Sequence, residues 1–367
     1  MGFKCGIVGL PNVGKSTIFN ALTSAGAEAA NFPFCTKEPN VGMVGIPDLR
    51  LSALSKVYKP KREVPAVMQF VDIAGLVKGA SQGEGLGNQF LSHIRETDAV
   101  MHVVRCFEDI DVVHVEGSVD PVRDADVVNT ELVLRDLDTV DKKLSKDKKL
   151  ASLATKEGKE AKLRVDTLEK LKATFDKAEP GRNAGLTADE SSLIKDLGLL
   201  TVKPMFYCAN VREDEIHTGN DHVKAMIAYG QTQGCEVLVF SGKIESEIAE
   251  LGQDEKAAFL EEMGLKESGL AQVIRKGFSM LGLQTYFTAG EQEVRAWTIH
   301  KGWKAPQAAG VIHSDFERGF ICAETLGYSD FTRFGTWQAA KEKGLVRTEG
   351  KEYVIRDGDI VHFLFNV

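Results

Sequence analysis

The apolar positions of this chain follow three different patterns along its length. In the first, short apolar runs of strand length alternate with stretches suited to helices; these runs lie at 3–8, 64–71, 99–104, 203–209 and 236–240. Short buried strands that alternate with helices are typical of an α/β fold with a parallel sheet. We therefore expect one α/β domain over residues 1–282.

The second pattern fills the middle of the chain, where residues 119–177 carry leucines at roughly helical intervals among many charges. The leucines are Leu132, Leu137, Leu144, Leu150, Leu153, Leu163, Leu168 and Leu171. A narrow apolar stripe on a largely charged surface predicts a protruding helical hairpin, with Gly158 as the candidate turn. Because strand-like runs resume at residue 203, this coiled-coil-like arm, residues 130–200, interrupts the α/β domain.

The third pattern begins near residue 283 and consists of short apolar strands separated by glycine turns. The expected strands are 295–299, 310–313, 319–323 and 360–365. Short strands around one or two helices predict a compact β-grasp-like α+β domain over residues 283–367. Trp297 and Phe365 are expected in its core. Its basic residues are either a face for RNA or protein, or ordinary solvated surface.

Composition narrows the class of protein. The 367 residues carry 45 Lys and Arg against 53 Asp and Glu, a net charge of −8, so no overall basic surface favours nucleic acid and no DNA partner is expected. The six cysteines lack CxxC spacing, which suggests neither zinc nor disulfides. No apolar run approaches about 18 residues, and the N-terminus enters a strand at once, so neither a membrane span nor a signal peptide is expected. We expect a soluble cytoplasmic protein of two or three domains.

The first segment with recognisable chemistry runs from Gly9 to Thr17 and fits the Walker A pattern, between an expected strand and an expected helix. Its two glycines let the backbone turn N–H groups toward one anion at the positive end of a helix. Lys15 is expected to act on the β- and γ-phosphates, and Ser16 to bind Mg²⁺. The candidate phosphate-binding residues are Asn12, Val13, Gly14, Lys15, Ser16 and Thr17. The alternative is a chance glycine turn before an amphipathic helix.

Two later segments have the character of nucleotide switches. The stretch 31–36, broken by proline, offers the Thr36 hydroxyl to complete a Mg²⁺ shell when a γ-phosphate is present; the alternative is a loop with an apolar plug. Residues 72–75 form a DxxG arrangement after an expected strand. Asp72 is expected to hold a Mg²⁺-bound water, and the Gly75 N–H to approach the γ-phosphate. The glycines that crowd the following stretch favour a mobile second switch.

The residue that follows DxxG raises the question of how the attacking water is oriented. Many GTPases use a glutamine there, whereas this chain has Leu76, so another residue, a partner or a bound cation must position the water. Asn12 is a candidate to help hold K⁺. His114 is the candidate catalytic histidine, on a loop beyond the strand end, with an ordinary surface position as the alternative. His102 lies inside an apolar run and is expected in the core.

Two segments that follow later strands resemble base-reading loops. The residues 210–213, Asn-Val-Arg-Glu, stand where guanine-binding proteins carry NKxD, and 241–243, Ser-Gly-Lys, stand at a second base loop. In NKxD, the aspartate accepts hydrogen bonds from two guanine N–H groups. Here Glu213 stands in place of that aspartate, and its extra methylene shifts the carboxylate. Val211 replaces the lysine that packs on the base, so adenine becomes a plausible base for this site. The candidate base-binding residues are Asn210, Val211, Glu213, Ser241 and Gly242.

Taken together, these motifs resemble those of the YchF/Obg-like ATPase family over almost the whole chain. The resemblance rests on Gly9–Thr17, on 31–36, on 72–80, on 210–213 and on the run 283–290. It implies an α/β P-loop NTPase fold, a Ras-like G domain with an inserted α-helical arm and a C-terminal TGS domain. It also implies ATP hydrolysis in preference to GTP hydrolysis, with Mg²⁺, and association with ribosomes.

The function expected on these grounds is a Mg²⁺-dependent ATPase switch that regulates translation or a stress response. Its partner would be the ribosome or the large subunit, through rRNA and protein, with no membrane involved. The arm offers five candidate lysines for RNA phosphates, or else a solvated helix face: Lys142, Lys143, Lys146, Lys148 and Lys149. The alternatives are a GTPase of the same architecture and a nucleotide-gated ribosome adaptor with negligible turnover.

Overall fold

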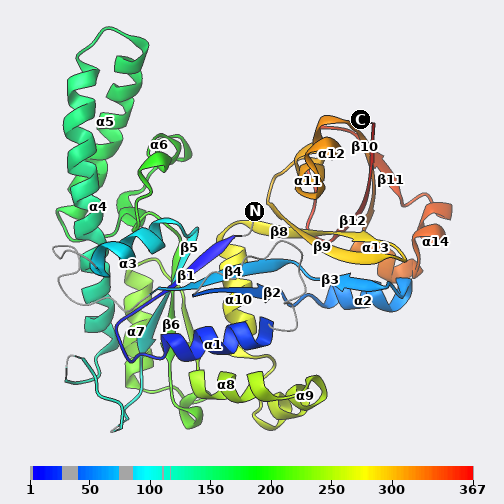
Figure 1. The fold of residues 1–367 in the computed structure, drawn as a ribbon, viewed down its shortest axis with the longest axis horizontal. Helices are drawn as coiled ribbons and strands as arrows, with labels where there is room; N and C mark the ends of the chain where they lie inside the picture. The colour runs from blue at the N-terminus through cyan, green and yellow to red at the C-terminus, as the bar shows by residue number, and fades with distance from the viewer. Residues whose placement is uncertain (1–2, 27–39, 74–85, 110, 116, 367) are drawn as a thin grey trace. The chain divides into compact units, whose positions relative to one another are not determined.

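The structure, a computed structural model, describes residues 3–26, 40–73, 86–109, 111–115 and 117–366. Its internal contacts divide the chain into two units. One holds residues 1–43 and 69–273, and the other holds residues 44–68 and 274–367. Figure 1 labels most of their helices and strands. No helix among the described residues has the length and apolarity that crossing a bilayer requires.

The first unit is built on a six-stranded sheet. Its strand order is β2 (Val41–Gly45), β4 (Val67–Asp72), β1 (Lys4–Val8), β5 (Ala99–Arg105), β6 (Met205–Asn210) and β7 (Val237–Phe240). The pairs β1–β4, β1–β5, β5–β6 and β6–β7 are parallel. Every residue of β5 and β6 is buried, as in central strands that are covered on both faces. Parallel strands bring their carboxyl ends to one edge, and that edge carries the site described below.

Helices follow most strands of this sheet. They are α1 (Lys15–Gly26), α3 (Leu86–Arg95), α7 (Asp221–Thr232), α8 (Gly242–Glu250), α9 (Gln253–Glu262) and α10 (Gly269–Met280). The alternation of strand and helix confirms the predicted α/β fold. His102 also lies where it was predicted: it is 1% exposed, and burial lowers its pKa to about 3.

The predicted arm is a pair of antiparallel helices, α4 (Pro121–Ala151) and α5 (Lys156–Phe175), which run side by side in Figure 1. Buried residues of both helices, among them Val140, Leu144 and Leu168, form one apolar cluster. Three short helices follow α5 at the base of the arm: η2 (Gly181–Ala184), α6 (Ala188–Leu193) and η3 (Lys195–Leu197). The buried Asp136 carboxylate fixes this base, because it accepts hydrogen bonds from the N–H groups of Leu200 (2.8 Å) and Thr201 (2.7 Å).

The turn of the hairpin differs from the prediction. It lies at 152–155, and Gly158 is already in the first turn of α5, where its N–H is capped by the Thr155 hydroxyl at 3.1 Å. Glycine is required there for another reason. A Cβ at 158 would come within 2.1 Å of the Leu153 carbonyl oxygen. The prediction of a turn at Gly158 was wrong because the glycine serves close packing just after the turn.

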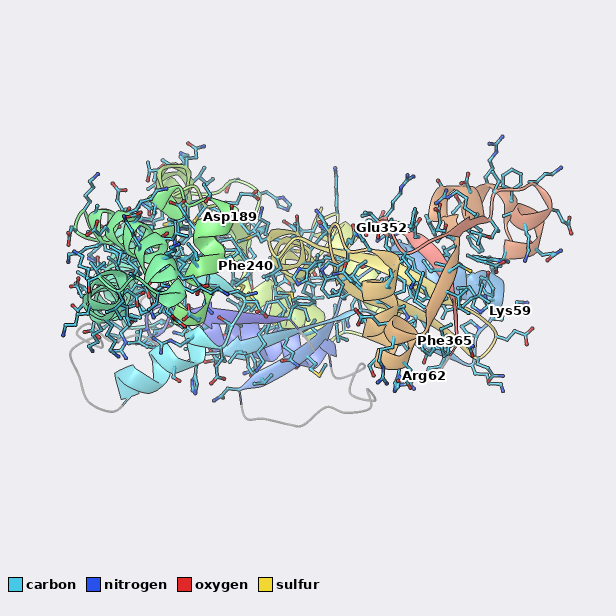
Figure 2. All side chains as sticks on the ribbon, turned by 90° about the horizontal axis from the view of Figure 1, so that it is seen from above. Lys59, Arg62, Asp189, Phe240, Glu352 and Phe365 are labelled. Carbon is cyan, nitrogen blue, oxygen red and sulfur yellow. The ribbon has the colours of Figure 1, made fainter. Side chains whose placement is uncertain are left out.

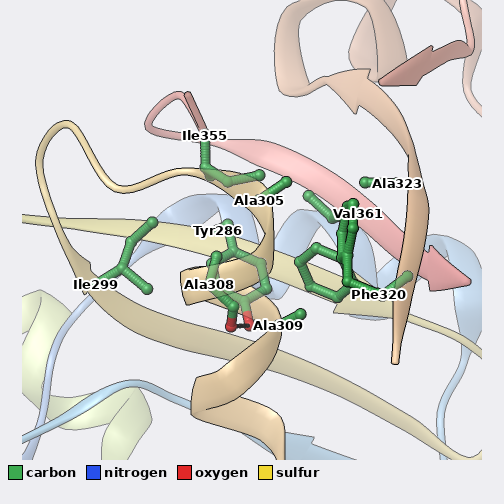
Figure 3. Close-up of a cluster of buried hydrophobic side chains, with 10 residues drawn as sticks. Tyr286, Ile299, Ala305, Ala308, Ala309, Phe320, Ala323, Ile355 and Val361 are labelled. Carbon is green, nitrogen blue, oxygen red and sulfur yellow. Dashed lines mark hydrogen bonds between the residues drawn. The ribbon is translucent and has the colours of Figure 1, made fainter. Parts of the chain in front are cut away.

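The second unit has its own six-stranded sheet. Its order is β11 (Arg347–Glu349), β10 (Phe320–Gly327), β12 (Asp359–Phe365), β8 (Leu283–Ala289), β9 (Glu293–His300) and β3 (Arg62–Val64). Its helices are α2 (Leu49–Tyr58), α11 (Ala305–Ile312), α12 (Ser314–Arg318), α13 (Tyr328–Phe334) and α14 (Trp337–Glu342). The remaining short 3₁₀ helix, η4 (Glu213–Glu215), belongs to the first unit. Figure 3 shows the core of the second unit, where α11 packs on β8 and β12 and the Tyr286 hydroxyl donates to the Ala308 carbonyl at 3.0 Å.

Two predictions for this unit were wrong. Residues 310–312, expected in a strand, end helix α11, which starts with Pro306 in its first turn and buries alanines 305, 308 and 309 at helical spacing. A short apolar run does not by itself distinguish helix from strand. Phe365, expected in the core, is 37% exposed and stacks on Phe316 with ring centroids 3.7 Å apart. Trp297 is partly buried against the core cluster.

The sequence predicted one boundary between the two main domains, at 282/283. The contacts divide the chain differently, because residues 44–68 pack with the C-terminal part of the chain. Lys59, a left-handed residue (φ 46°), ends α2, and β3 begins at Arg62; both residues are labelled in Figure 2. Strand β3 runs parallel to β9, with Val64 opposite Arg295. An early segment of the chain therefore completes the edge of the C-terminal sheet.

Arg50 joins this early segment to the rest of the second unit. Its guanidinium contacts the Asp48 carboxylate at 2.8 Å and the Asp357 carboxylate at 2.7 Å, and it lies over the Phe287 ring at 5.2 Å. Asp357 in turn accepts a hydrogen bond from the Thr285 N–H at 2.9 Å. One half-buried side chain thus connects the start of α2, strand β8 and the turn before β12.

We predict that Arg50→Ala lowers the free energy of unfolding of the second unit by about 1–2 kcal/mol. The loss is no larger because the ion pairs of Arg50 are partly exposed and water screens them. The three tryptophans, Trp297, Trp303 and Trp337, all lie in this unit, so their fluorescence during urea unfolding reports on it. Arg333→Ala, which removes an exposed arginine of the same unit, is the control. Equal midpoints for the two variants would contradict the assigned role.

Candidate functional site

A pocket of about 1160 Å³ lies where the loops after β1, β5, β6 and β7 meet. It brings together nearly all the residues predicted to bind phosphate or base: Asn12, Gly14, Lys15, Ser16, Thr17, Asn210, Val211, Glu213, Ser241 and Gly242. Val13, in the same loop, is buried and does not line the pocket. Segments separated by about 200 positions in the sequence therefore form one site.

The phosphate loop has the backbone that the Walker A pattern predicts. Gly9, Asn12 and Gly14 have φ values of 150°, 63° and 100°. At Gly9, a Cβ would come within 2.4 Å of the Val103 carbonyl oxygen, and at Gly14, within 2.4 Å of the Asn210 amide nitrogen. Helix α1 begins directly afterwards at Lys15, so the loop ends at the positive end of a helix, where an anion is stabilised.

Lys15 is held inside this loop. The residue is 7% exposed, and its ammonium donates to the Leu10 carbonyl at 2.6 Å. Burial lowers the pKa of Lys15 to about 8, and the charge of Asp72 opposes this shift. Among the described residues, the one hydrogen-bond acceptor of this buried cation is a neutral carbonyl, so an arriving anion would stabilise the ammonium and this position suits a phosphate.

Ser16 and Asp72 are suited to a divalent cation. Burial raises the pKa of Asp72 above its ordinary value, while the charge of Lys15 and a hydrogen bond from the Ser16 hydroxyl act in the opposite direction. The buried Oδ1 of Asp72 has no hydrogen-bond partner among the described residues. A hydroxyl beside an incompletely paired carboxylate is an oxygen donor set that Mg²⁺ prefers. Thr36 and Gly75, the other two residues predicted near the γ-phosphate, lie outside the described residues.

Asn210 connects the phosphate loop to the base loop. Its side chain is nearly buried; Nδ2 donates to the Val13 carbonyl at 3.0 Å, and Oδ1 accepts from the Gly242 N–H at 2.9 Å. A side-chain amide has a donor and an acceptor on separate atoms, so it can bond to both loops at once. Asn210 therefore fixes the distance between the two loops.

Glu213 is paired with a residue that the sequence analysis named only as part of a loop. The Lys243 ammonium lies 2.6 Å from Glu213 Oε1, and the two side chains are 71% and 37% exposed, respectively. Val211 is 3% exposed and presents an aliphatic side chain to the pocket. The base region therefore combines an apolar contact with a carboxylate that is already engaged by a lysine.

The sequence left two positions open for His114, a loop that faces the phosphates or the protein surface, and the structure shows neither. The histidine is buried rather than on the surface, and it does not line the pocket. Its Nε2 lies 2.8 Å from Asp124 Oδ2, and Arg123 contacts the other oxygen of that carboxylate at 3.0 Å. The neighbouring Val113 carbonyl accepts a hydrogen bond from the Asn12 amide at 3.2 Å. The histidine thus lies one residue from a contact to the phosphate loop, but turned toward Asp124.

The sequence analysis missed one wall of the pocket, the loop after β5. Phe107, Glu108, Asp109 and Val112 all line the cavity. No nucleotide motif marks this loop. The one available signal is Arg105, an arginine at the end of an otherwise apolar strand.

Two protein-family models match the chain. A model described as "50S ribosome-binding GTPase" matches residues 4–160. The C-terminal model of YchF GTPases, described as a protein of unknown function, matches residues 283–366.

Relatives match over the full length. The ribosome-binding ATPase YchF of Bacillus subtilis is 55% identical over 369 residues and that of Haemophilus influenzae 54% over 367, and each alignment covers 100% of both chains. The solved structure of the Schizosaccharomyces pombe YchF GTPase is 40% identical, has a TM-score of 0.90 and covers 99% of this chain and 98% of its own. With such identity over both chains, and with the phosphate loop, the arm and the C-terminal unit in place, the chain belongs to the YchF family.

Proposed function

We propose that this protein is a Mg²⁺-dependent ATPase that acts as a ribosome-associated switch in the cytoplasm. The observation that carries the choice of ATP is the base region of the pocket, where Val211 is buried and Glu213 is paired with Lys243. The names of the bacterial relatives, ribosome-binding ATPase, support both the activity and the partner.

The base region lacks what guanine recognition requires. A guanine site needs a carboxylate free to accept from two N–H groups, because unpaired donors in a pocket cost affinity. Here Glu213 carries one more methylene than aspartate, and its Oε1 is held by Lys243. Adenine does not present that pair of donors, and its faces pack on apolar groups such as Val211 and Phe107, which both line the pocket.

A GTPase of the same architecture is the second candidate. The solved fission-yeast relative is named a GTPase, as is the family model that matches residues 4–160. The phosphate loop serves either nucleotide, so the two functions differ only at the base.

The chemistry proposed for the site is in-line attack of water on the γ-phosphate. Lys15 would leave the Leu10 carbonyl for the phosphates, and together with the loop N–H groups it would stabilise the charge that develops in the transition state. Ser16 and Asp72 would hold Mg²⁺, which supplies charge neutralisation when it is bound. Asn12 remains a candidate to help hold K⁺. Since Leu76 stands where a glutamine would orient the water, intrinsic turnover is expected to be slow.

His114 is our candidate for orienting the water. It would have to leave Asp124 to do so, because the imidazole does not line the pocket in this structure. The hydrogen bond between Asn12 and the Val113 carbonyl gives a route by which an occupied phosphate loop could shift this segment.

For ribosome binding we propose the outer half of the arm, through RNA phosphates. Residues 145–164 carry seven Lys and Arg and three Asp and Glu, so 7 − 3 gives a net charge of +4 on a chain whose total is −8. Toward the base of the arm, Lys142 and Lys172 are paired with Asp138 and Asp141. Among the described residues, five exposed lysines of the outer half have no ion pair: Lys146, Lys149, Lys156, Lys159 and Lys162. Positive charge free of intramolecular partners is available to phosphates.

Our first prediction concerns the base. We expect Val211→Lys combined with Glu213→Asp to move the ratio of ATP to GTP affinity at least tenfold toward GTP, about 1.4 kcal/mol. Equilibrium binding of both labelled nucleotides measures the ratio, with Glu213→Asp alone as the control for the shortened carboxylate. An unchanged ratio in the double variant would show that these positions do not select the base.

The second prediction concerns His114. His114→Ala should lower kcat about 100-fold or more, as loss of a water-orienting group does, while ATP affinity stays within about twofold. Single-turnover hydrolysis and equilibrium binding separate the two quantities. His93→Ala, which changes an exposed histidine on α3, should leave both unaltered. A kcat within about twofold of wild type after His114→Ala would remove this residue from the mechanism.

The third prediction concerns the arm. Glutamine at positions 146, 149, 156 and 159 together should weaken binding to the large ribosomal subunit by about tenfold or more and reduce its salt dependence, because fewer phosphate contacts release fewer counterions. The control variant carries glutamine at Lys142, Lys148, Lys170 and Lys172, which are all paired within the arm region. Equal losses in the two variants would argue against a specific role for the unpaired lysines of the outer half.

A further inference from the structure

Arg105 is a buried arginine that no nucleotide motif includes. It ends strand β5, is 1% exposed, and belongs to the largest fully buried side chains of the described residues. All three guanidinium nitrogens donate to carbonyl groups of the loop that follows: Nε to Phe107 at 3.1 Å, Nη1 to Val112 at 2.9 Å and Nη2 to Asp109 at 3.1 Å. The guanidinium carbon also lies 4.7 Å from the centre of the Phe107 ring.

The loop that Arg105 holds is a wall of the nucleotide pocket. Phe107, Asp109 and Val112, whose carbonyls accept from the guanidinium, also line the cavity. The start of the loop is fixed as well, because the Cys106 N–H donates to the Asn210 carbonyl at 2.8 Å and the Cys106 carbonyl accepts from the Asn220 side chain at 2.6 Å.

Arg105 therefore has a counterpart across the site. It stands opposite Asn210 in the pairing of β5 with β6. The Asn210 side chain fixes the phosphate loop and the base loop, and the Arg105 side chain fixes the loop that carries Phe107. Two adjacent strand ends thus organise different walls of one pocket.

An apolar residue would be the ordinary choice at the end of such a strand, since burying a charge is costly unless it is well paired. Arginine differs from lysine in presenting a rigid fork that can satisfy several carbonyls of one loop at once. The contacts of Arg105 match that property, because the hydrogen bonds of its three guanidinium nitrogens described above all go to backbone atoms within seven residues of the chain. The arrangement shapes a loop rather than neutralising a carboxylate.

We propose that Arg105 is a positioning residue for the purine base, acting through the Phe107–Val112 wall. The phosphate loop takes its conformation from its glycines and Asn210, and it contacts this segment through the Asn12–Val113 hydrogen bond, which the Arg105 side chain does not make. Loss of the Arg105 guanidinium should therefore weaken the contacts of the pocket to the base and leave its contacts to the phosphates unchanged. This inference rests on the proposed function, namely that the pocket binds ATP.

The test compares ATP with inorganic tripolyphosphate, which has the phosphates and no base. For Arg105→Lys we expect ATP affinity to fall about tenfold or more, with KM rising, while tripolyphosphate affinity and kcat stay within about twofold. Equal losses for the two ligands, or no loss for ATP, would overturn the proposal. Arg182→Lys, a partly exposed arginine of the same unit that does not line the pocket, is the matched control and should change neither affinity.

A second variant keeps the test decisive if Arg105→Lys folds poorly. Phe107→Leu removes the ring on which the guanidinium packs without touching the backbone carbonyls. It should show the same selective loss of ATP affinity, and the double variant should lose less than the sum of the two single losses. Unchanged ATP affinity in Phe107→Leu would contradict the proposal. If the wild type itself bound ATP no more tightly than tripolyphosphate, the proposed function would fail, and not only the role of Arg105.

Discussion

The distance between the phosphate loop and the base loop depends on one buried carboxamide. Asn210 donates to the Val13 carbonyl and accepts from the Gly242 N–H, at 3.0 and 2.9 Å. The close approach also explains a glycine: a side chain at Gly14 would collide with the Asn210 amide, at 2.4 Å. A nucleoside triphosphate would contact both loops at once, so a site for it needs the two loops held at a defined separation. The parallel sheet supplies the neighbouring strand ends that make this contact possible.

The second unit depends on a different long-range contact. Between β2 and β4 the chain leaves the α/β sheet and adds β3 to the edge of the C-terminal sheet. Arg50, at the start of α2, holds this segment there between Asp48 and Asp357. In the sequence this segment lies between the two stretches expected to act as switches, 31–36 and 72–75. The chain that joins those two stretches is therefore part of the C-terminal unit's structure.

Local patterns predicted much of the site, and non-local contacts account for what they missed. The phosphate loop, Asp72 and the base loops were predictable because each is a short motif after a buried strand. The wall at Phe107–Val112 was not, because its shape depends on the buried fork of Arg105. The pairing of β3 with β9 joins residues far apart in sequence, and the run at 310–312 is too short for its period to separate helix from strand. His114 was selected from its place after a strand, but the structure buries it against Asp124 and outside the pocket lining, a contact that the sequence does not predict.

The central claim is that this pocket selects adenine through Val211, Phe107 and a Glu213 that is already paired with Lys243. The most direct test is equilibrium titration of the unmodified protein with labelled ATP and labelled GTP, in the presence of Mg²⁺ and at one ionic strength. The account predicts that ATP binds at least tenfold more tightly, a difference of about 1.4 kcal/mol. Equal affinities, or tighter binding of GTP, would contradict it and would favour a GTPase with a tolerant base pocket.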